Sequence, residues 1–404
     1  FRIGRNREAD QAQETEALPL LAFTETMSSS SNVDDIEKHV LRKYDILQKL
    51  GKGAYGVVWK AIEKKTGQVV ALKKIFDAFQ NATDAQRTYR EIMFLRKLRR
   101  HANIVKLMNV LRAENDKDIY LVFEYMETDL HAVLRAKILQ DIHKQYVIYQ
   151  LLKALKYLHS GDLLHRDIKP SNLLLNSECL MKLADFGLAR SVASLKTGTG
   201  PNPILTDYVA TRWYRAPEIL LGSNRYTKAV DMWSVGCILG ELLLEKPMFP
   251  GTSTMNQLDF IMQITGKPTA EDMEAINSSF ASKMLENIGN VERKSLSSLF
   301  PKASPEAMDL LEKLMTFNPD IRLTAEEALE HPYVAMFHNE AEEVNSSEQI
   351  TIPLDDNTKL PVSVYRERLY AELSSRRRRE QRRDGRGSSS RLTSGGGSSS
   401  SLRK

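Results

Sequence analysis

Cysteine is scarce in this sequence: only Cys179 and Cys237 occur among its 404 residues. Two distant cysteines cannot form a disulfide framework, and they are too few for a cysteine-rich metal site. The simplest interpretation is a protein of a reducing compartment. This predicts a cytoplasmic location, extended to the nucleus if the basic tail described below directs import.

Long apolar runs are also missing. No window holds eighteen consecutive apolar residues, so the sequence predicts no membrane span. The opening residues, FRIGRNREADQAQETE, lack the basic-then-apolar pattern of a secretory signal. Met27 is followed by four serines and resembles a natural start, so residues 1–26 are interpreted as either an upstream piece or an artificial addition.

Excess basic charge is absent from the body of the chain and gathers at its end. Between Arg366 and Lys404 there are twelve Arg or Lys residues against four Asp or Glu, an excess larger than the net charge of +5 for the whole chain. The rest of the chain is therefore slightly acidic, which argues against nucleic-acid binding by the body. The stretch RRRREQRR fits a nuclear import signal, a tether to an anionic surface or a solvated tail.

The composition predicts a structured body with disordered ends. Hydrophobic residues make up 42% of the chain, which is enough for a sizeable core. Residues 1–32 are polar, and residues 376–404 form a basic low-complexity tail, so both are expected to be disordered. Residues 335–375 include LPVSVYRERLYAEL, with apolar residues at helical spacing, and this C-terminal extension is predicted to pack back on the body.

Residues 44–334 change character partway along. From about 44 to 126, β-branched alternation punctuated by glycine predicts antiparallel strands. One helix is expected there at TDAQRTYREIMFLRKLR, with Thr83 as its N-cap. From about 127 to 334 the pattern becomes helical, and AVDMWSVGCILGELLLEK should be a buried central helix. The predicted fold class is α+β, a monomer with a small β-rich lobe before a larger helical lobe.

A glycine-rich motif, GKGAYGVV, lies between two of the predicted strands. Its residues of interest are Gly51, Lys52, Gly53, Ala54, Tyr55, Gly56 and Val58. Glycines let backbone amides approach phosphate oxygens without interference from a Cβ atom. The flanking strands disfavour a dinucleotide-binding fold, and the Gly-Lys-Ser/Thr ending of a Walker loop is missing. Alone this motif is weak, because most such matches are turns.

The next motif is VALK, in which Lys73 closes a predicted strand. A lysine at this place can pair with nucleotide phosphates, and Glu91 on the predicted helix can hold it as an ion pair. The ordinary alternative is a surface lysine and a solvated glutamate.

Two further motifs, HRDIKPSN and DFG, supply the groups that phosphoryl transfer needs. Asn172 and Asp185 fit oxygen ligands of Mg²⁺. Asp167 fits the carboxylate that orients an attacking hydroxyl, and Lys169 could steady the charge of the transferred group. Any one of these residues would more often be a cap or a turn residue. Four motifs in this order, each in its expected strand or loop, make that alternative negligible.

On these motifs, residues 44–334 resemble a complete eukaryotic protein kinase catalytic domain. The resemblance extends to the APE tripeptide ending at Glu218, to Asp231 in the apolar helix and to Arg322. It implies a bilobal kinase fold, ATP as substrate and Mg²⁺ as cofactor. It also implies that Glu218 pairs with Arg322 and that Asp231 anchors the catalytic loop.

Two longer stretches, TDYVATRWYRAPEILLG and FPGTSTMNQLDFIMQITGKP, resemble the mitogen-activated protein kinases. Residues 268–300 resemble the insert of that group and of its cyclin-dependent relatives. The long segment SLKTGTGPNPI and the basic tail resemble the atypical extracellular-signal-regulated subgroup, although Asp207 stands where many members have Glu. Male-germ-cell-associated kinases share Thr-Asp-Tyr and stay an alternative. The family implies protein substrates with Ser/Thr-Pro sites.

The resemblance also assigns nucleotide-binding and regulatory residues. Backbone groups of Glu124 and Met126 are expected to bind adenine, and Asp129 the ribose. Thr206 and Tyr208 lie between DFG and APE and are expected to switch the enzyme on when phosphorylated, by an upstream kinase or by the enzyme itself. The arginines expected to receive these phosphates are Arg90, Arg166 and Arg190 for Thr206, and Arg212 and Arg215 for Tyr208.

Two other interpretations compete with an active kinase. A pseudokinase scaffold typically lacks the lysine or one of the aspartates, all of which are present here. A cyclin-dependent enzyme is disfavoured, because the helix around Glu91 does not read as a cyclin-binding helix.

The acidic run NEAEE, with Glu340, Glu342 and Glu343, lies where the family places a docking surface for basic motifs; a solvated helix end is the alternative.

Overall fold

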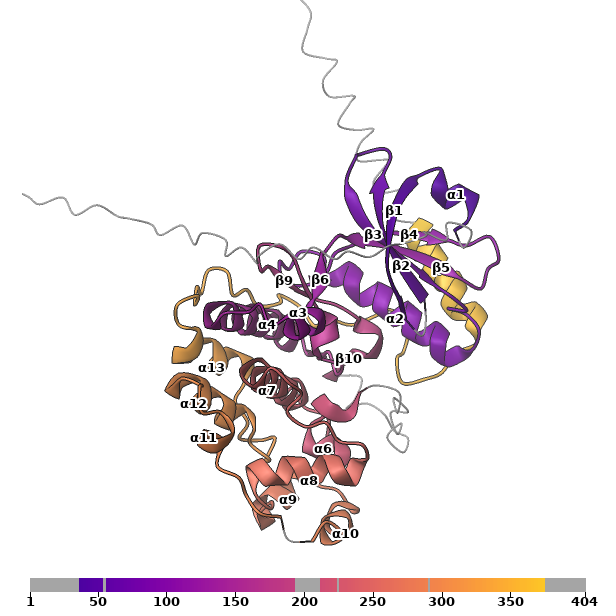
Figure 1. Ribbon diagram of the computed structural model, residues 1–404. Helices are drawn as coiled ribbons and strands as arrows, with labels where there is room; N and C mark the ends of the chain where they lie inside the picture. The colour runs from indigo at the N-terminus through magenta and orange to yellow at the C-terminus, as the bar shows by residue number, and fades with distance from the viewer. Residues whose placement is uncertain (1–35, 54–55, 193–210, 224, 290, 375–404) are drawn as a thin grey trace, which may run out of the picture.

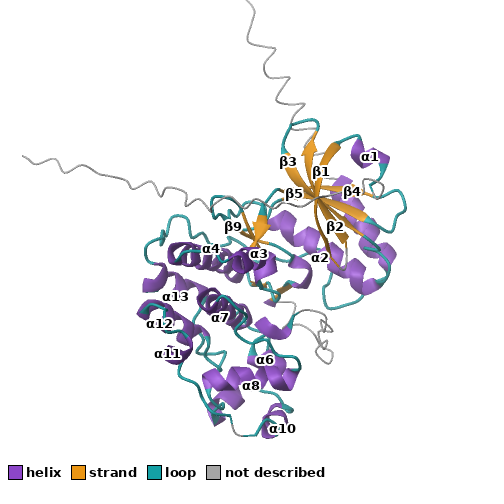
Figure 2. Ribbon diagram, viewed as in Figure 1, coloured by secondary structure: helices purple, strands orange, loops and turns teal. Residues whose placement is uncertain are grey.

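The computed structural model forms a small lobe built on one β-sheet and a larger lobe of helices (Figures 1 and 2). This confirms the α+β class and the order of the lobes predicted from the sequence. The residues that the structure describes are 36–53, 56–192, 211–223, 225–289 and 291–374.

The small lobe is a five-stranded antiparallel sheet in the order β1-β2-β3-β5-β4. Its strands are β1 (Tyr44–Gly53), β2 (Gly56–Glu63), β3 (Val69–Ile75), β4 (Leu107–Arg112) and β5 (Ile119–Glu124). Side chains of β2 and β3 alternate between buried and less buried positions, as expected of strands that cover a core with one face. The turn between them places Gly67 at φ 73°, which glycine adopts without a steric penalty. The short helix α1 (Lys38–Leu41) precedes the sheet.

Helix α2 (Ala82–Leu98) lies below the sheet and contacts the DFG segment (Figure 1). It begins after Asn81, whose side chain accepts hydrogen bonds from the N–H groups of Thr83 and Asp84 at 2.9 and 3.0 Å. The expectation that Thr83 caps the helix is therefore wrong. Asn81 has the extended backbone of an N-cap, with φ −140°, whereas Thr83 already lies in the first turn.

Two long helices, α4 (Asp141–Ser160) and α7 (Ala229–Leu244), form the centre of the large lobe. Fourteen consecutive residues of α7, from Ala229 to Leu242, are buried, which confirms the predicted central helix. The other helices are α3 (Leu130–Ala136), α6 (Pro217–Leu220), α8 (Thr254–Thr265), α9 (Ala270–Ile276), α10 (Ala281–Glu286), α11 (Leu296–Leu299), α12 (Pro305–Leu314) and α13 (Ala325–Leu329). Helices α9 to α11 lie in the stretch that resembles the kinase insert.

Short elements at the junction of the lobes carry the catalytic motifs. They are the strands β6 (Thr128–Asp129), β7 (Leu163–Leu164), β8 (Leu173–Leu175), β9 (Met181–Leu183) and β10 (Arg190–Ser191), and the 3-10 turns η2 (Pro170–Asn172) and η3 (Phe186–Leu188). Two other 3-10 turns, η4 (Arg212–Tyr214) and η5 (Pro332–Val334), pack against helices of the large lobe. Strands β8 and β9 pair with each other, and β7 pairs with β10. These pairings bring the motifs HRDIKPSN and DFG side by side.

The C-terminal segment returns to the small lobe. A helix over residues 362–374, drawn in yellow in Figure 1, lies against the sheet lobe near α2. Its Tyr365 and Leu369 are buried, and the Tyr365 ring lies 5.8 Å from that of Tyr89 on α2. Across the described part of the chain, every helix is too short or too polar to cross a membrane.

Candidate active site

An ion pair between β3 and α2 lies on the sheet side of the junction. The Lys73 ammonium is 3.1 Å from the buried Glu91 carboxylate. Burial alone would lower the pKa of Lys73, but the carboxylates of Glu91 and Asp185 outweigh it and raise that pKa above its usual value. Lys73 is therefore charged at neutral pH and can face an anionic ligand.

The loop after β7 brings the predicted catalytic residues together. Lys169 Nζ lies 2.7 Å from Asp167 Oδ2. Asn172 Nδ2 donates to the backbone carbonyl of Asp167 at 2.7 Å and to Asp167 Oδ2 at 3.2 Å. Because the amide nitrogen faces Asp167, the Asn172 Oδ1 atom points elsewhere, and it is the atom suited to a cation.

Asp231 on α7 holds this loop from the core side. Its carboxylate accepts hydrogen bonds from the N–H groups of His165 and Arg166 at 2.9 and 2.8 Å, and it lies 3.0 Å from His159 Nε2. Burial would raise the pKa of Asp231, but the imidazoles of His159 and His165 lower it, so the carboxylate is ionised. These bonds support Arg166 at φ 68°, which is costly for a residue other than glycine. The predicted anchoring by Asp231 is confirmed.

Asp185 also has a left-handed backbone, with φ 62°. Its Oδ1 atom accepts from the Gly187 N–H at 3.3 Å, and its Oδ2 atom lies 3.4 Å from the guanidinium of Arg87 on α2. Burial would raise the pKa of Asp185, but the cations of Lys73 and Arg87 outweigh it and lower that pKa. The next residue, Phe186, is fully buried and fixes the segment in the core.

The glycines of the GKGAYGVV motif divide into two kinds. A Cβ atom on Gly56 would collide with the Lys74 carbonyl oxygen of β3, so strand packing alone requires glycine there. Gly51 and Gly53, by contrast, have open space where a Cβ atom would lie, and both are exposed, as is Lys52. Packing does not require these two glycines, and they leave the backbone open to a ligand. Two further residues of the motif lie outside the described residues: Ala54 and Tyr55.

The chain that joins the lobes carries the residues predicted to hold adenine and ribose. Met126 is buried and Val58 of β2 is half-buried. The Glu124 carboxylate accepts from the Lys106 N–H at 2.7 Å, so this side chain is engaged in the fold. Asp129 Oδ1 caps α3 by accepting the N–H three residues on at 2.9 Å.

The arginines predicted to receive a phosphate on Thr206 lie close to the catalytic motifs. Arg90 and Arg190 both bind one carboxylate, that of Asp356, at 2.9–3.0 Å. Arg166 Nη1 donates to the Leu188 carbonyl at 3.0 Å. The structure therefore unites two of the three arginines around an anion from the C-terminal segment.

The two arginines predicted for Tyr208 lie further along the chain. Arg212 donates to the Thr252 carbonyl at 3.1 Å, and Arg215 follows the same 3-10 turn, η4. Thr206 and Tyr208 themselves lie outside the described residues.

The acidic run NEAEE is a turn rather than a helix end. Glu343 is only 3% exposed and accepts from the Asn339 N–H at 3.0 Å. Glu342 pairs with Lys153 of α4 at 3.0 Å while its side chain stays exposed. Glu343 is therefore part of the fold and unsuited to bind a docking partner, whereas Glu340 and Glu342 are on the surface.

Sequence reasoning missed three residues that shape the site: Asp356, Arg87 and His159. His159 and Arg87 lie on helices that were predicted, but no motif marks them as partners of Asp231 and Asp185. Asp356 is 266 residues from Arg90, and only the preceding acidic residue gives it any sequence signal.

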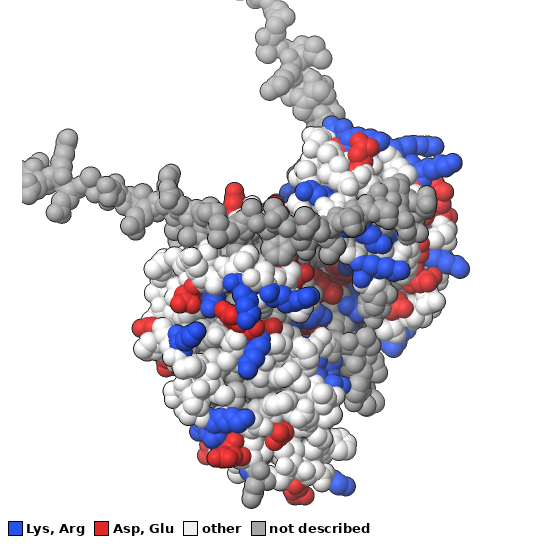
Figure 3. Space-filling view, in the orientation of Figure 1, with Lys and Arg blue, Asp and Glu red and all other residues white. Residues whose placement is uncertain are grey.

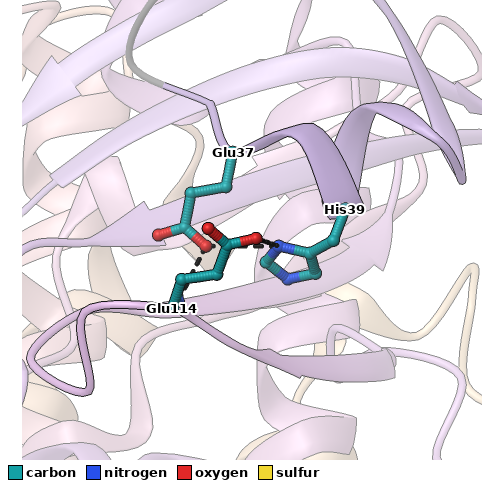
Figure 4. Close-up of side chains that lie close together, drawn as sticks. All are labelled: Glu37, His39 and Glu114. Atoms are coloured by element: carbon teal, nitrogen blue, oxygen red, sulfur yellow. Dashed lines mark hydrogen bonds and ion pairs between the residues drawn. The ribbon is translucent and has the colours of Figure 1, made fainter.

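A further cluster of side chains with metal-ligand atoms lies elsewhere, on the small lobe (Figure 4). Among the described residues, the group of His, Asp, Glu or Cys atoms close enough together is Glu37, His39 and Glu114. His39 Nδ1 lies 3.3 Å from the Glu37 carboxylate and 3.2 Å from that of Glu114, and His39 Nε2 lies 3.0 Å from the Arg112 carbonyl oxygen. In Figure 3, acidic and basic groups are interspersed on the visible face.

Comparison with known proteins agrees with this geometry. A family model described as "Protein kinase domain" matches residues 44–334. Extracellular signal-regulated kinase 2 of Dictyostelium discoideum is 69% identical over 340 residues, which cover 84% of this chain and 92% of the relative. Mitogen-activated protein kinase 15 is 59% identical in Xenopus laevis and 51% identical in Rattus norvegicus. Each alignment covers 85% of this chain, but only 58% and 63% of the relative.

The fold and the site thus define a protein kinase, an enzyme that uses ATP and acts on protein substrates. The chain belongs to the mitogen-activated protein kinase family, and its activity is that of a serine/threonine kinase. The family predicted from the sequence is confirmed.

Proposed function

We propose that this kinase transfers the γ-phosphoryl group of ATP to Ser or Thr hydroxyls that precede proline, and that phosphates on Thr206 and Tyr208 switch it on. The observation that carries the proposal is the pairing of Lys73 on β3 with Glu91 on α2, within the small lobe. The same pairing is required in active protein kinases, because it places the lysine against the nucleotide phosphates.

The catalytic loop supplies the remaining roles. Asp167 accepts a hydrogen bond from the attacking hydroxyl and orients it toward the phosphoryl group. Lys169, whose Nζ atom lies 2.7 Å from Asp167 Oδ2, places a positive charge beside the phosphoryl group that is transferred. Gly51 and Gly53 offer backbone N–H groups to the phosphates, and the backbone of Glu124 and Met126 faces adenine.

Mg²⁺ fits the oxygen atoms at this place. Asp185 is ionised by its cationic neighbours, and Asn172 turns its amide oxygen away from Asp167. An ionised carboxylate and an amide oxygen are hard ligands of the kind this cation prefers. When bound, the cation would neutralise charge on the β- and γ-phosphates.

Regulation by a cyclin is not favoured. The C-terminal segment already packs on α2 through Asp356 and Tyr365, and this is the helix that carries Glu91. The fold therefore supplies its own partner for α2.

The exposed Glu340 and Glu342 are the surface acids available to a basic docking motif.

Proline selection can be tested with matched peptides. We expect Ser-Pro and Thr-Pro peptides to be phosphorylated at least about tenfold faster, as kcat/KM, than the same peptides with Ala for Pro. Asp185→Ala serves as the inactive control, with an expected loss of about a thousandfold because charge on the phosphates is no longer neutralised. Equal rates on the two peptides would refute the proline preference.

The switch can be tested separately. Thr206→Ala and Tyr208→Phe should each reduce kcat/KM by about tenfold or more without changing the thermal midpoint, because each phosphate provides one to three charge-assisted hydrogen bonds to arginines. Mass spectrometry of the intact chain and of Lys73→Arg then separates autophosphorylation from an upstream kinase. Full activity of the double variant would contradict the proposed switch.

A further inference from the structure

The C-terminal segment places one buried carboxylate between two buried arginines. Arg90 Nε and Nη2 donate to the two oxygens of Asp356 at 2.9–3.0 Å, and Arg190 Nη1 donates to Asp356 Oδ2 at 3.0 Å. The exposed fractions of these side chains are 4% for Arg90, 9% for Arg190 and 3% for Asp356. Two cations so deeply buried require a nearby anion, and Asp356 is that anion.

The two arginines belong to the parts of the kinase that must be aligned for activity. Arg90 precedes Glu91 on α2, and its Nη1 atom also donates to the Gly187 carbonyl of the DFG motif at 2.6 Å. Arg190 lies on β10, which pairs with β7 ahead of the catalytic loop. Asp356 therefore links α2 to the DFG segment and to the strand beyond it.

Several contacts hold Asp356 itself in place. The Gln86 side chain, one turn before Arg90 on α2, donates to the Asp356 backbone carbonyl at 3.1 Å. The hydroxyl of Thr358, two residues after Asp356, donates to the carboxylate of Asp355, the residue just before Asp356, at 2.6 Å. The Thr358 carbonyl accepts a hydrogen bond from the buried Tyr365 hydroxyl at 3.2 Å. The carboxylate is thus presented on a braced loop.

We propose that Asp356 is a positioning residue for the kinase reaction, an internal anion that aligns α2 with the DFG segment without any phosphate on the chain. It occupies the arginines assigned above to phospho-Thr206, so this interpretation rests in part on the proposed function. The contact coexists with the Lys73–Glu91 pair at 3.1 Å, so it supports the aligned arrangement instead of opposing it. A carboxylate supplies one negative charge where a phosphate would supply about −1.5 to −2.

The first test compares two neighbouring aspartates in the Thr206→Ala background, which carries no phosphate at that site. Asp356→Asn is expected to weaken ATP binding about tenfold, as the Kd from calorimetry, because lost charge-assisted hydrogen bonds no longer hold Glu91 against Lys73. Amide exchange in α2 should rise with it. Asp355→Asn removes the same charge from an exposed position but keeps a side-chain oxygen that can accept from the Thr358 hydroxyl, so it should change Kd less than about twofold.

A second variant separates positioning from a loss of folding. Asp356→Ala leaves a gap between the two arginines into which formate fits. Formate at tens of millimolar should restore ATP affinity to this variant, whereas chloride at equal ionic strength should not, because only formate offers two oxygens to the guanidinium. Unchanged affinity in Asp356→Asn, tighter binding, or equal effects of formate and chloride would each overturn the proposal. ATP binding and amide exchange do not depend on proline preference or on the loop switch, so failure of the proposed function would be seen separately.

Discussion

At the scale of single residues, neighbouring glycines of one motif are under different physical constraints. Gly56 lies where β2 passes the backbone of β3 too closely for any Cβ atom. Gly53 has open space where a Cβ atom would lie, so packing does not require a glycine there. The spacing of the motif does not distinguish the two positions, because it reflects both constraints at once.

This difference predicts that the same glycine-to-alanine substitution changes the free energy of unfolding at one position and not at the other. Gly56→Ala should destabilise the small lobe by about 1–3 kcal/mol, the usual cost of forcing extra atoms into a packed region. Gly53→Ala should leave the free energy of unfolding unchanged within about 1 kcal/mol. Chemical unfolding of both variants measures the difference, and equal destabilisation would show that Gly53 is also needed for packing.

Predictability also differs from residue to residue. Lys73, Asp167 and Asp185 could be found from the sequence because short motifs fix their neighbours. Asn81 could not be preferred over Thr83 as the cap of α2, since both side chains suit that role and only the backbone angle decides. Asp356 had no local pattern beyond the acidic residue before it, because its arginine partners lie 166 and 266 residues away and the contact exists only after folding.

At the scale of elements, one buried ion pair ties the loop between α12 and α13 to helices α6 and α7, about a hundred residues earlier in the chain. Arg322 Nη1 and Nη2 donate to the two oxygens of Glu218 on α6 at 2.8 and 3.0 Å, which confirms the pairing implied by the resemblance. Arg322 also donates to the carbonyl of Ala229, at the start of α7. Both charged side chains are at most 1% exposed. A similar forked pair, Arg225 with Asp320, has side chains 43% and 47% exposed.

These two pairs allow a matched comparison of burial. Glu218→Gln should cost about 3–5 kcal/mol of unfolding free energy, because it leaves a guanidinium buried without its counter-charge. Asp320→Asn should cost less than about 1 kcal/mol, since water screens an exposed pair. Denaturant titration of the two variants gives both values. A Glu218→Gln variant as stable as Asp320→Asn would mean that the Arg322 hydrogen bonds to backbone carbonyls are sufficient alone.

At the scale of the whole molecule, the C-terminal end of the described chain packs back on the lobe that comes first in the sequence. The last described helix, residues 362–374, comes after the entire large lobe and yet packs on the small lobe (Figure 1). Leu369 is fully buried in the same core cluster as Tyr89 of α2, and Arg366 donates to the Asp116 carbonyl at 3.3 Å in the turn between β4 and β5. The C-terminal segment therefore couples the two lobes as a strap, and α2 should be rigid only when that strap is in place.

The coupling predicts distinct effects for two apolar residues of this helix. Leu369→Ala should destabilise the strap by about 2–5 kcal/mol, the usual cost of emptying a buried leucine site. Amide exchange in α2 should then accelerate, while exchange in the central helix α7 stays slow, because α7 lies in the other lobe. Val364→Ala, on the same helix but 37% exposed, is the control and should change stability by less than about 0.5 kcal/mol. Faster exchange in α7 as well as α2 would indicate global unfolding, and unchanged exchange in α2 would show that this helix does not brace it.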